Sequence, residues 1–140
     1  MVSPQFQLRI CTPRGELFSG LVTEAILPGL DGEVGVLAGH KNFIGLLGTG
    51  VLKLVRDGDD YWFMLSVGVF EMRGGALTVL AEIAEPASEI NNQLNAERVK
   101  ELESSISSMS SYLDDYAQLK VEYDRASARL EAYRRTHLVN

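Results

Sequence analysis

Glycine and proline are confined to one part of this chain. All thirteen glycines and all four prolines lie within the first 86 residues, and neither type occurs after Pro86. Glycine permits backbone conformations that turns require, and proline interrupts helices. The sequence therefore predicts two parts: a turn-rich β domain over residues 1–86 and a helical domain over residues 87–140.

Short apolar runs in the first part have the pattern of strands. Phe6, Leu8 and Ile10 alternate with polar residues, as in a half-buried strand. Further runs lie at residues 16–22, 23–28, 34–38, 51–56, 61–67, 69–73 and 76–83. Asp57-Gly58 and Gly74-Gly75 are typical of tight hairpin turns between neighbouring strands. Many short strands at this spacing predict a sandwich or barrel with mostly antiparallel pairing.

The second part changes to a helical period. Apolar residues recur at intervals of three and four in two stripes: Val99, Leu102, Ile106 and Met109, then Tyr116, Leu119, Tyr123, Ala126, Leu130 and Tyr133. A serine-rich segment at residues 107–111 separates them, and Asp114 or Asp115 is placed to cap the second helix. This pattern predicts an antiparallel hairpin, with one long helix through the serines as the alternative. Both stripes are narrow, so the hairpin is expected to be able to leave its resting place.

Composition and charge exclude several classes of protein. The net charge of −6 is unlike that of a general nucleic-acid binder. No apolar run approaches the ~20 residues of a membrane span, and the N-terminus lacks the pattern of a signal peptide. The single cysteine, Cys11, lies in an apolar run and is expected to be a buried, inert thiol rather than a reactive one.

Residues with catalytic or metal-binding potential are few and scattered. One cysteine and two distant histidines, His40 and His137, do not give a zinc-binding pattern, and no phosphate loop or nucleophile turn is present. Asp31 and Glu33 flank Gly32 in a turn, where carboxylates are usually solvated. We therefore expect no catalytic residues and no metal site, and the hypothesis of a small enzyme or metalloprotein is disfavoured.

The second helix carries a group of basic residues. Arg125 and Arg129 are four residues apart and share a helix face, and Arg134 and Arg135 extend the charge towards the helix end. Two interpretations remain open from the residues alone. This is either a solvated face that complements the helix dipole or a docking face for an acidic partner.

Several motifs in order along the chain resemble one family. The segment from Ile26 to His40, ILPGLDGEVGVLAGH, closely resembles the LPGxxGExGVLPGH stretch of the epsilon subunit of bacterial F-type ATP synthases. The flanking sequence continues the similarity through LRICTPRGELFSGLV from Leu8, GVLKL from Gly50, LTVLAE from Leu77 and DYAQL from Asp115. Ala38, Lys41, Asn42 and Val67 depart from the family pattern, all at turns.

The resemblance implies a fold and a function. The fold would be α+β in two parts: a flattened ten-stranded β-sandwich followed by an antiparallel two-helix hairpin. The protein would be a non-catalytic subunit of the central stalk, the rotor that couples rotation of the proteolipid ring to ATP synthesis. Its partners would be the gamma subunit, the ring of c subunits and the beta subunit. It would lie peripherally on the cytoplasmic face of the bacterial inner membrane, through the complex alone, and its C-terminal helices would inhibit ATP hydrolysis.

The resemblance also carries roles to particular positions. Asp31, Gly32 and Glu33 match the ring-facing loop, and His40 matches a position on the gamma side. The arginines at 125, 129, 134 and 135 match the helix that meets an acidic segment of the beta subunit.

A second motif leaves an alternative function open. Residues 94–99, LNAERV, resemble imperfectly the [I/L]DxxRA motif through which some members bind ATP, with Asn95 in place of the acidic residue and Arg98 retained. An ATP-sensing module is therefore the alternative function, with ATP as a regulatory ligand and otherwise no cofactor.

Overall fold

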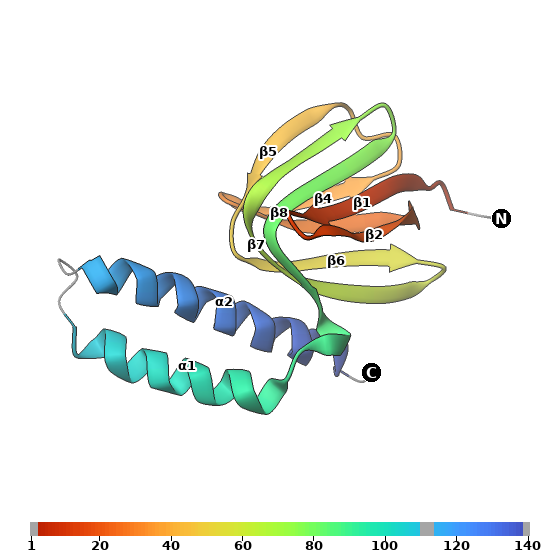
Figure 1. Ribbon diagram of the computed structural model, residues 1–140. Coiled ribbons are helices and arrows are strands. Elements are labelled where there is room, and N and C mark those ends of the chain that lie inside the picture. The colour runs from red at the N-terminus through yellow and green to blue at the C-terminus, as the bar shows by residue number, and fades with distance from the viewer. Residues whose placement is uncertain (1–2, 110–113, 139–140) are drawn as a thin grey trace.

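The computed structural model describes residues 3–109 and 114–138, which form eight strands, one 3₁₀ turn and two helices (Figure 1). The strands are β1 (Phe6–Thr12), β2 (Gly15–Val22), β3 (Glu24–Gly29), β4 (Gly32–Leu37), β5 (Phe43–Leu47), β6 (Gly50–Arg56), β7 (Asp59–Arg73) and β8 (Ala76–Pro86). They are followed by η1 (Ala87–Glu89), α1 (Asn92–Ser107) and α2 (Asp114–Thr136). The change from strand to helix thus falls between Pro86 and Ala87.

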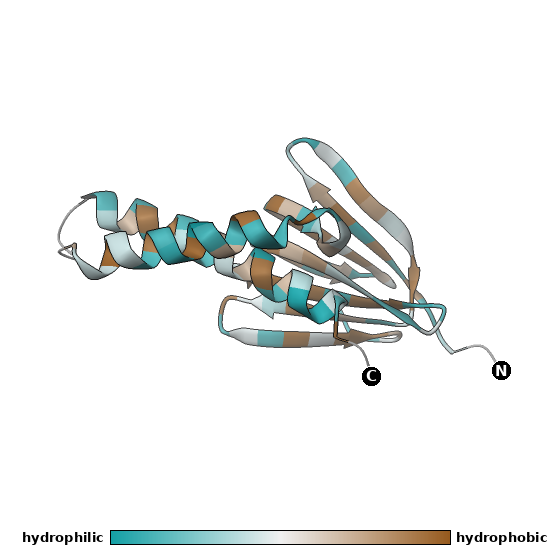
Figure 2. Cartoon of the chain, turned by 90° about the horizontal axis from the view of Figure 1, so that it is seen from below, coloured by the Kyte–Doolittle hydropathy of each residue, from teal (hydrophilic) through white to brown (hydrophobic). Residues whose placement is uncertain are grey.

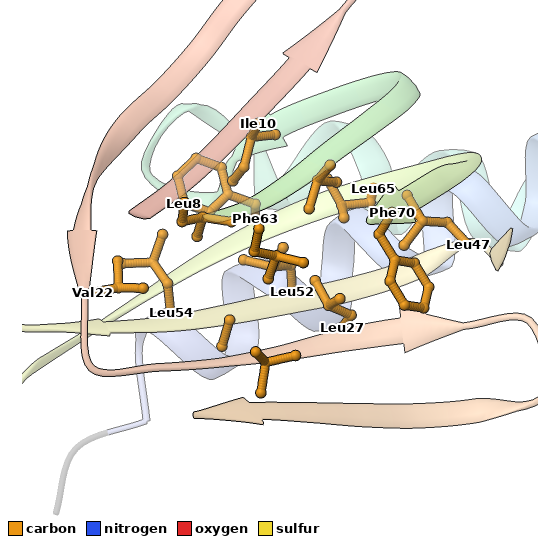
Figure 3. Close-up of a cluster of buried hydrophobic side chains, with 14 of the residues drawn as sticks. Leu8, Ile10, Val22, Leu27, Leu47, Leu52, Leu54, Phe63, Leu65 and Phe70 are labelled. Atoms are coloured by element: carbon orange, nitrogen blue, oxygen red, sulfur yellow. The ribbon is translucent and has the colours of Figure 1, made fainter. Parts of the chain in front are cut away.

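The strands form two layers that enclose one core. The first layer has the order β2-β1-β8-β7-β5, and the second contains β4, β3, β6 and further segments of β7 and β8. Pairing is antiparallel except between β1 and β8, which run parallel. Inward-facing side chains of both layers meet in a continuous hydrophobic cluster, with Leu8, Leu27, Leu52 and Leu65 fully buried (Figure 3).

The number of strands differs from the ten that the resemblance implied. β7 and β8 are long, and each contributes to both layers: β7 pairs with β6 over residues 59–65 and with β5 over residues 68–72. If each were divided where it changes layer, ten segments would result. The structure keeps both strands continuous, so the count is eight.

The change of layer occurs at Val67 on β7 and at Glu82 on β8. The register of the two strands is the same on both sides of this corner, but Val67 and Glu82 are not paired. Core-facing positions on β7 change there from odd (Phe63, Leu65) to even (Phe70, Met72). Each strand therefore has one extra residue at the corner, which moves its following side chains to the opposite face.

The predicted turns are present, and one strand was missed. Asp57-Gly58 joins β6 to β7, and Gly74-Gly75 joins β7 to β8, with positive φ at all four residues. β5 was absent from the expected strands because it is a short run beside the loop that contains His40.

Cys11 was expected to be buried, which is wrong. It follows the fully buried Ile10 and lies on the outer face of the sheet, half-buried.

The C-terminal helices form the expected antiparallel hairpin, and the alternative of one long helix is wrong (Figure 1). α1 begins after Asn91, whose side chain accepts a hydrogen bond from the Leu94 amide and so caps the helix. α2 begins at Asp114, so its N-cap lies outside the described residues. Hydrophilic residues predominate on the hairpin (Figure 2), and Leu102 is the buried residue of α1.

The corner generates a prediction about Val67. This residue has φ of 33°, a left-handed conformation that is strained for a β-branched side chain. Val67→Gly should therefore raise the free energy of unfolding by about 1 kcal/mol, since relief of strain exceeds the entropic cost of glycine. Val69 lies in the same strand but does not have a positive φ, so Val69→Gly should lower the free energy of unfolding. Chemical denaturation of the purified chain measures both, and a stability loss in Val67→Gly would contradict the inference.

Candidate interaction surfaces

The outer face of the first layer carries exposed apolar side chains. Leu46, Val69 and Leu80 are cross-strand neighbours on β5, β7 and β8, and their exposed fractions are 57%, 40% and 49%. Ile44, on the same face of β5, is 72% exposed. Contiguous exposed apolar side chains on a sheet face are typical of a packing surface for another protein. We call these four residues the apolar row.

The hairpin covers the β6 and β7 part of the outer face of the second layer. Met64 of β7 packs with Ala128 and Ala132 of α2 and with Ile90, in a second cluster separate from the main core. Trp62 and Val51 lie at its margin. α2 makes this contact, and α1 packs on α2 (Figure 1). Among the described residues, the helices therefore occupy part of one outer face of the sandwich and leave the other outer face bare.

Two of the predicted docking arginines are turned towards the sandwich. Arg129 donates two hydrogen bonds to the Glu85 carboxylate, at 2.8 Å from Nε and 3.0 Å from Nη2. Arg125 donates from Nε to the hydroxyl of the fully buried Ser66 at 3.0 Å, and its Nη2 lies 3.5 Å from a Glu82 oxygen. Neither guanidinium is freely solvated in this arrangement, since their side chains are 23% and 25% exposed. The two arginines hold α2 on the sandwich.

The other two arginines interact within their own helix. Arg134 donates two hydrogen bonds to Glu131, and Arg135 donates one, at 2.7 Å. The Arg135 guanidinium also lies 5.7 Å from the centre of the Trp62 ring. The hydrogen bond from Arg134 holds the pKa of Glu131 below its ordinary value, with a smaller contribution from Arg135 and in opposition to partial burial. The four arginines therefore do not form the single positive surface that their spacing predicted.

The three residues matched to a ring-facing loop lie at the tip of the β3–β4 hairpin. Gly32 has φ of 134°, which favours glycine, and Asp31 and Glu33 on either side are exposed. Leu30 beside them is 61% exposed and donates its amide hydrogen to the Leu46 carbonyl oxygen, which ties the tip to β5. Glu33 also borders a groove under α2, together with Trp62. The tip of the β3–β4 hairpin is thus exposed, and a backbone hydrogen bond holds it against β5, which carries Ile44 and Leu46 of the apolar row.

His40 lies between β4 and β5. Its Nδ1 is 2.9 Å from the Lys41 carbonyl oxygen, and its ring packs on Phe43 with 4.6 Å between centroids. Phe43 packs against the core and contacts Phe70 edge-on. His40 therefore sits on an ordered loop adjoining the apolar row.

The residues matched to a nucleotide motif lie in the first turns of α1. The Asn95 side chain donates to the Asn91 carbonyl oxygen at 2.8 Å. Arg98 pairs with Glu101 on its own helix and with Glu122 on α2, and the hydrogen bond to Glu122 is the main cause of its raised pKa. A phosphate would have to displace two carboxylates from this guanidinium. ATP binding at these residues stays an untested alternative.

The described residues contain no group of three or more His, Cys, Asp or Glu side chains placed to hold a metal ion. Among the helices that the structure describes, none is long and apolar enough to cross a membrane.

Sequence reasoning missed the residues that connect these surfaces. Ile44 and Leu46 lie on either side of Gly45, which is the pattern of one strand face. The apolar row also includes Val69 and Leu80, and only the pairing of β5 with β7 and of β7 with β8 shows that these residues are neighbours. No sequence pattern indicated that Ser66, Glu82 and Glu85 would contact α2. Their orientation depends on the corner at Val67, which the sequence does not reveal.

A sandwich with exposed apolar side chains on one face and a helix pair docked on part of the other is typical of an interaction module. Comparisons with known proteins specify which one. A family model described as ATP synthase, Delta/Epsilon chain, beta-sandwich domain matches residues 5–87. The chain is 34% identical over 128 residues to the ATP synthase epsilon chain of Synechococcus sp. (strain RCC307), covering 89% of this chain and 94% of that one. It is 30% identical over 129 residues to the epsilon chain of Rhodopseudomonas palustris (strain BisB18), covering 92% and 89%.

Solved structures show the same fold. A chain of the Euglena gracilis mitochondrial ATP synthase, in an OSCP/F1/c-ring structure, aligns with a TM-score of 0.79 at 22% identity, over 94% of this chain and 82% of that one. A chain of the Tetrahymena thermophila mitochondrial ATP synthase, in a central stalk/c-ring structure, aligns with a TM-score of 0.58 at 12% identity, over 98% and 100%. With the family model and the sequence relatives, the conclusion is plain: this chain belongs to the ATP synthase delta/epsilon family and is an F-type epsilon subunit.

The Glu131 carboxylate allows a direct test of the α2 electrostatics. Because Arg134 lowers its pKa, Glu131 stabilises the end of α2 at pH values above the ordinary glutamate pKa, and this stabilisation is lost as the pH falls through the lowered value. Arg134→Ala should raise the pKa of Glu131, and Arg135→Ala should raise it less. Titration of the side-chain carboxyl carbon by NMR measures both. An unchanged pKa of Glu131 in Arg134→Ala would mean that the ion pair between Arg134 and Glu131 does not form in solution.

Proposed function

We propose that this chain is a non-catalytic rotor subunit that couples proteolipid-ring rotation to ATP synthesis and whose C-terminal helices inhibit ATP hydrolysis. The observation that supports this proposal is the division of the sandwich into two outer faces. One presents the apolar row, suited to a permanent partner, and the other holds a helix pair through a separate apolar cluster and two arginines. Permanent binding and detachable regulation thus use opposite faces.

The apolar row is the proposed site for the gamma subunit. Its exposed side chains are on the face that the hairpin leaves bare, and His40 lies on the loop before β5 with its ring packed on Phe43. Stable protein contacts bury apolar side chains of this kind at their centre. A gamma helix packed here would leave α2 free to move on the other side.

The β3–β4 tip is the proposed contact with the ring of c subunits. Asp31 and Glu33 supply carboxylates and Leu30 an exposed apolar side chain, on a turn that Gly32 allows to be tight. Through gamma and this ring, the subunit would lie peripherally on the membrane, on its cytoplasmic face. The beta subunit is the proposed partner of the α2 arginines when the hairpin leaves the sandwich.

The function is tested with the assembled ATPase complex. Removal of residues 87–140 should leave the subunit bound and raise the steady-state rate of ATP hydrolysis, because the inhibitory helices are absent. The control is stoichiometric recovery of the truncated chain with gamma. An unchanged hydrolysis rate in a complex that retains the truncated chain would remove the inhibitory role.

The position of the gamma site is tested by substitution in the apolar row. Leu46→Ser with Leu80→Ser should weaken gamma binding at least tenfold, since each buried leucine contributes about 1.5–3 kcal/mol. Leu37→Ser is the matched control, because Leu37 is 58% exposed but lies on β4 in the other layer. Binding of purified gamma measured by calorimetry gives the comparison. If Leu37→Ser and the double variant lose equal affinity for gamma, the apolar row is not the gamma site.

A further inference from the structure

We propose that the open edge of β5 is a site for strand addition, and that an extended segment of the gamma subunit pairs with it and continues the first layer. Recognition at this edge uses backbone hydrogen bonds of Ile44 and Leu46, in addition to the side chains of the apolar row. The inference rests on the proposed function for the identity of the partner. The open edge itself is a property of this chain.

β5 is the last strand of the first layer, and most of its outer edge is unpaired (Figure 1). It pairs with β7 along its whole length. On its other side, among the described residues, the pairing is limited to Leu47 with Gly29 of β3. Beside that pair, the Leu30 amide donates to the Leu46 carbonyl oxygen. β3 therefore holds β5 at one end and leaves the rest of the edge open.

The direction of the open backbone groups follows from that hydrogen bond. In an antiparallel strand, the amide and carbonyl of one residue point to the same side, and the side alternates from residue to residue. Since the Leu46 carbonyl points away from β7, the Leu46 amide and both backbone groups of Ile44 do the same. Within the part of the chain that the structure describes, no backbone hydrogen bond reaches these three groups. They have the spacing that one further strand needs for pairing.

A groove of about 370 Å³ lies beside this edge. One of its walls is β5, the other is the tip of the β3–β4 hairpin, and Phe70 also lines it. Position 45 requires glycine, because a Cβ atom there would collide with the Phe70 ring. The ring thus fills the space beneath the middle of β5, and the edge of the strand stays open to the groove.

The composition of β5 is not that of an edge strand that stays in water. Natural sheets protect their open edges with charged residues, proline or bulges, because apolar edges aggregate. β5 has the sequence FIGLL, without charge or proline, and Ile44 and Leu46 are exposed. The strands at the two ends of the sheet order each contain a glutamate, Glu16 on β2 and Glu33 on β4. β5 is therefore the edge that a partner covers.

The surroundings of the edge define the chemistry of the added segment. A strand beside β5 directs its side chains alternately to the two faces of the sheet. Those on the outer face join Ile44 and Leu46 and are therefore apolar. The exposed carboxylates of Asp31 and Glu33 line the opposite wall of the groove, where they pair with a lysine or arginine. The occupant is an extended apolar segment with an adjoining basic residue.

The edge and the apolar row are continuous, which assigns the segment to gamma. Ile44 and Leu46 belong to both, since their side chains lie on the outer face and their backbone groups lie on the edge. A partner that covers the row therefore also reaches the edge. Backbone pairing fixes the register of such a partner, whereas apolar side chains alone allow it to slide.

Amide hydrogen exchange in the assembled ATPase complex tests the strand addition. The amide hydrogens of Ile44 and Leu46 should exchange about a hundredfold or more slowly in the complex than in the isolated chain, because they donate to the added strand. Gly35 of β4 is the internal control. Counted from the Gly29–Gly32 turn pair, its amide also points to an open edge, and its exchange should be unchanged.

Residue-resolved mass spectrometry of deuterium uptake measures all three amides. Exchange at Ile44 and Leu46 that is as fast in the complex as in the isolated chain would overturn the proposal. Equal slowing at Gly35 would overturn it too, since the protection would then not be specific to β5.

Proline substitution gives a second test. Ile44→Pro removes the amide hydrogen from the open edge without breaking a bond to β7, and proline is tolerated at such positions. It should weaken gamma binding at least about fivefold more than Ile44→Ala, which removes the side chain but keeps the amide. Leu46→Pro against Leu46→Ala repeats the comparison, with thermal unfolding as the check that each variant is folded. Equal affinities within both pairs would contradict the strand addition.

The complex also separates this inference from the proposed function. If the chain is recovered with gamma but the two β5 amides are not protected, gamma binds through side chains alone and the strand addition is wrong. If the chain is not recovered with gamma at all, the proposed partnership fails, and the assignment of the segment to gamma fails with it.

Discussion

The corner at Val67 and Glu82 is the constraint on which the rest of this structure depends. Each of the two longest strands has one extra residue there, so each changes layer and reverses which side chains face outward. Before the corner, β7 turns Met64 and Ser66 towards α2, and beyond it Val69 faces the bare side. One stretch of β7 thus contributes residues to the core, to the contact with α2 and to the apolar row. The strained backbone of Val67 is the local cost of this arrangement.

The two outer faces of the sandwich have different physical characters. The apolar row offers exposed apolar surface, whose burial is not weakened by the charge screening that salt produces. The face under α2 combines an apolar cluster around Met64 with charged hydrogen bonds, which high ionic strength weakens. The two kinds of contact surface therefore lie on opposite faces of the sandwich.

The arginines illustrate how tertiary contacts changed the interpretation of a sequence feature. Their spacing predicted one positive face, with solvation and partner docking as open alternatives. The structure divides them: Arg125 and Arg129 contact the sandwich, whereas Arg134 and Arg135 contact Glu131. Replacing Arg125 and Arg129 therefore weakens the docked state as well as any contact with a partner.

The sequence by itself determined the two-part organisation, the positions of the hairpin turns and the family, because glycine, proline and hydrophobic period act locally and the motifs occur in order. It also predicted most strands, but missed β5 and the outward position of Cys11. Only the tertiary structure decided the strand count, the apolar row and the partners of Arg125 and Arg129. Those features depend on the register between β5, β7 and β8 and on one extra residue at a corner. Such contacts join positions up to 59 residues apart, and no local pattern records them.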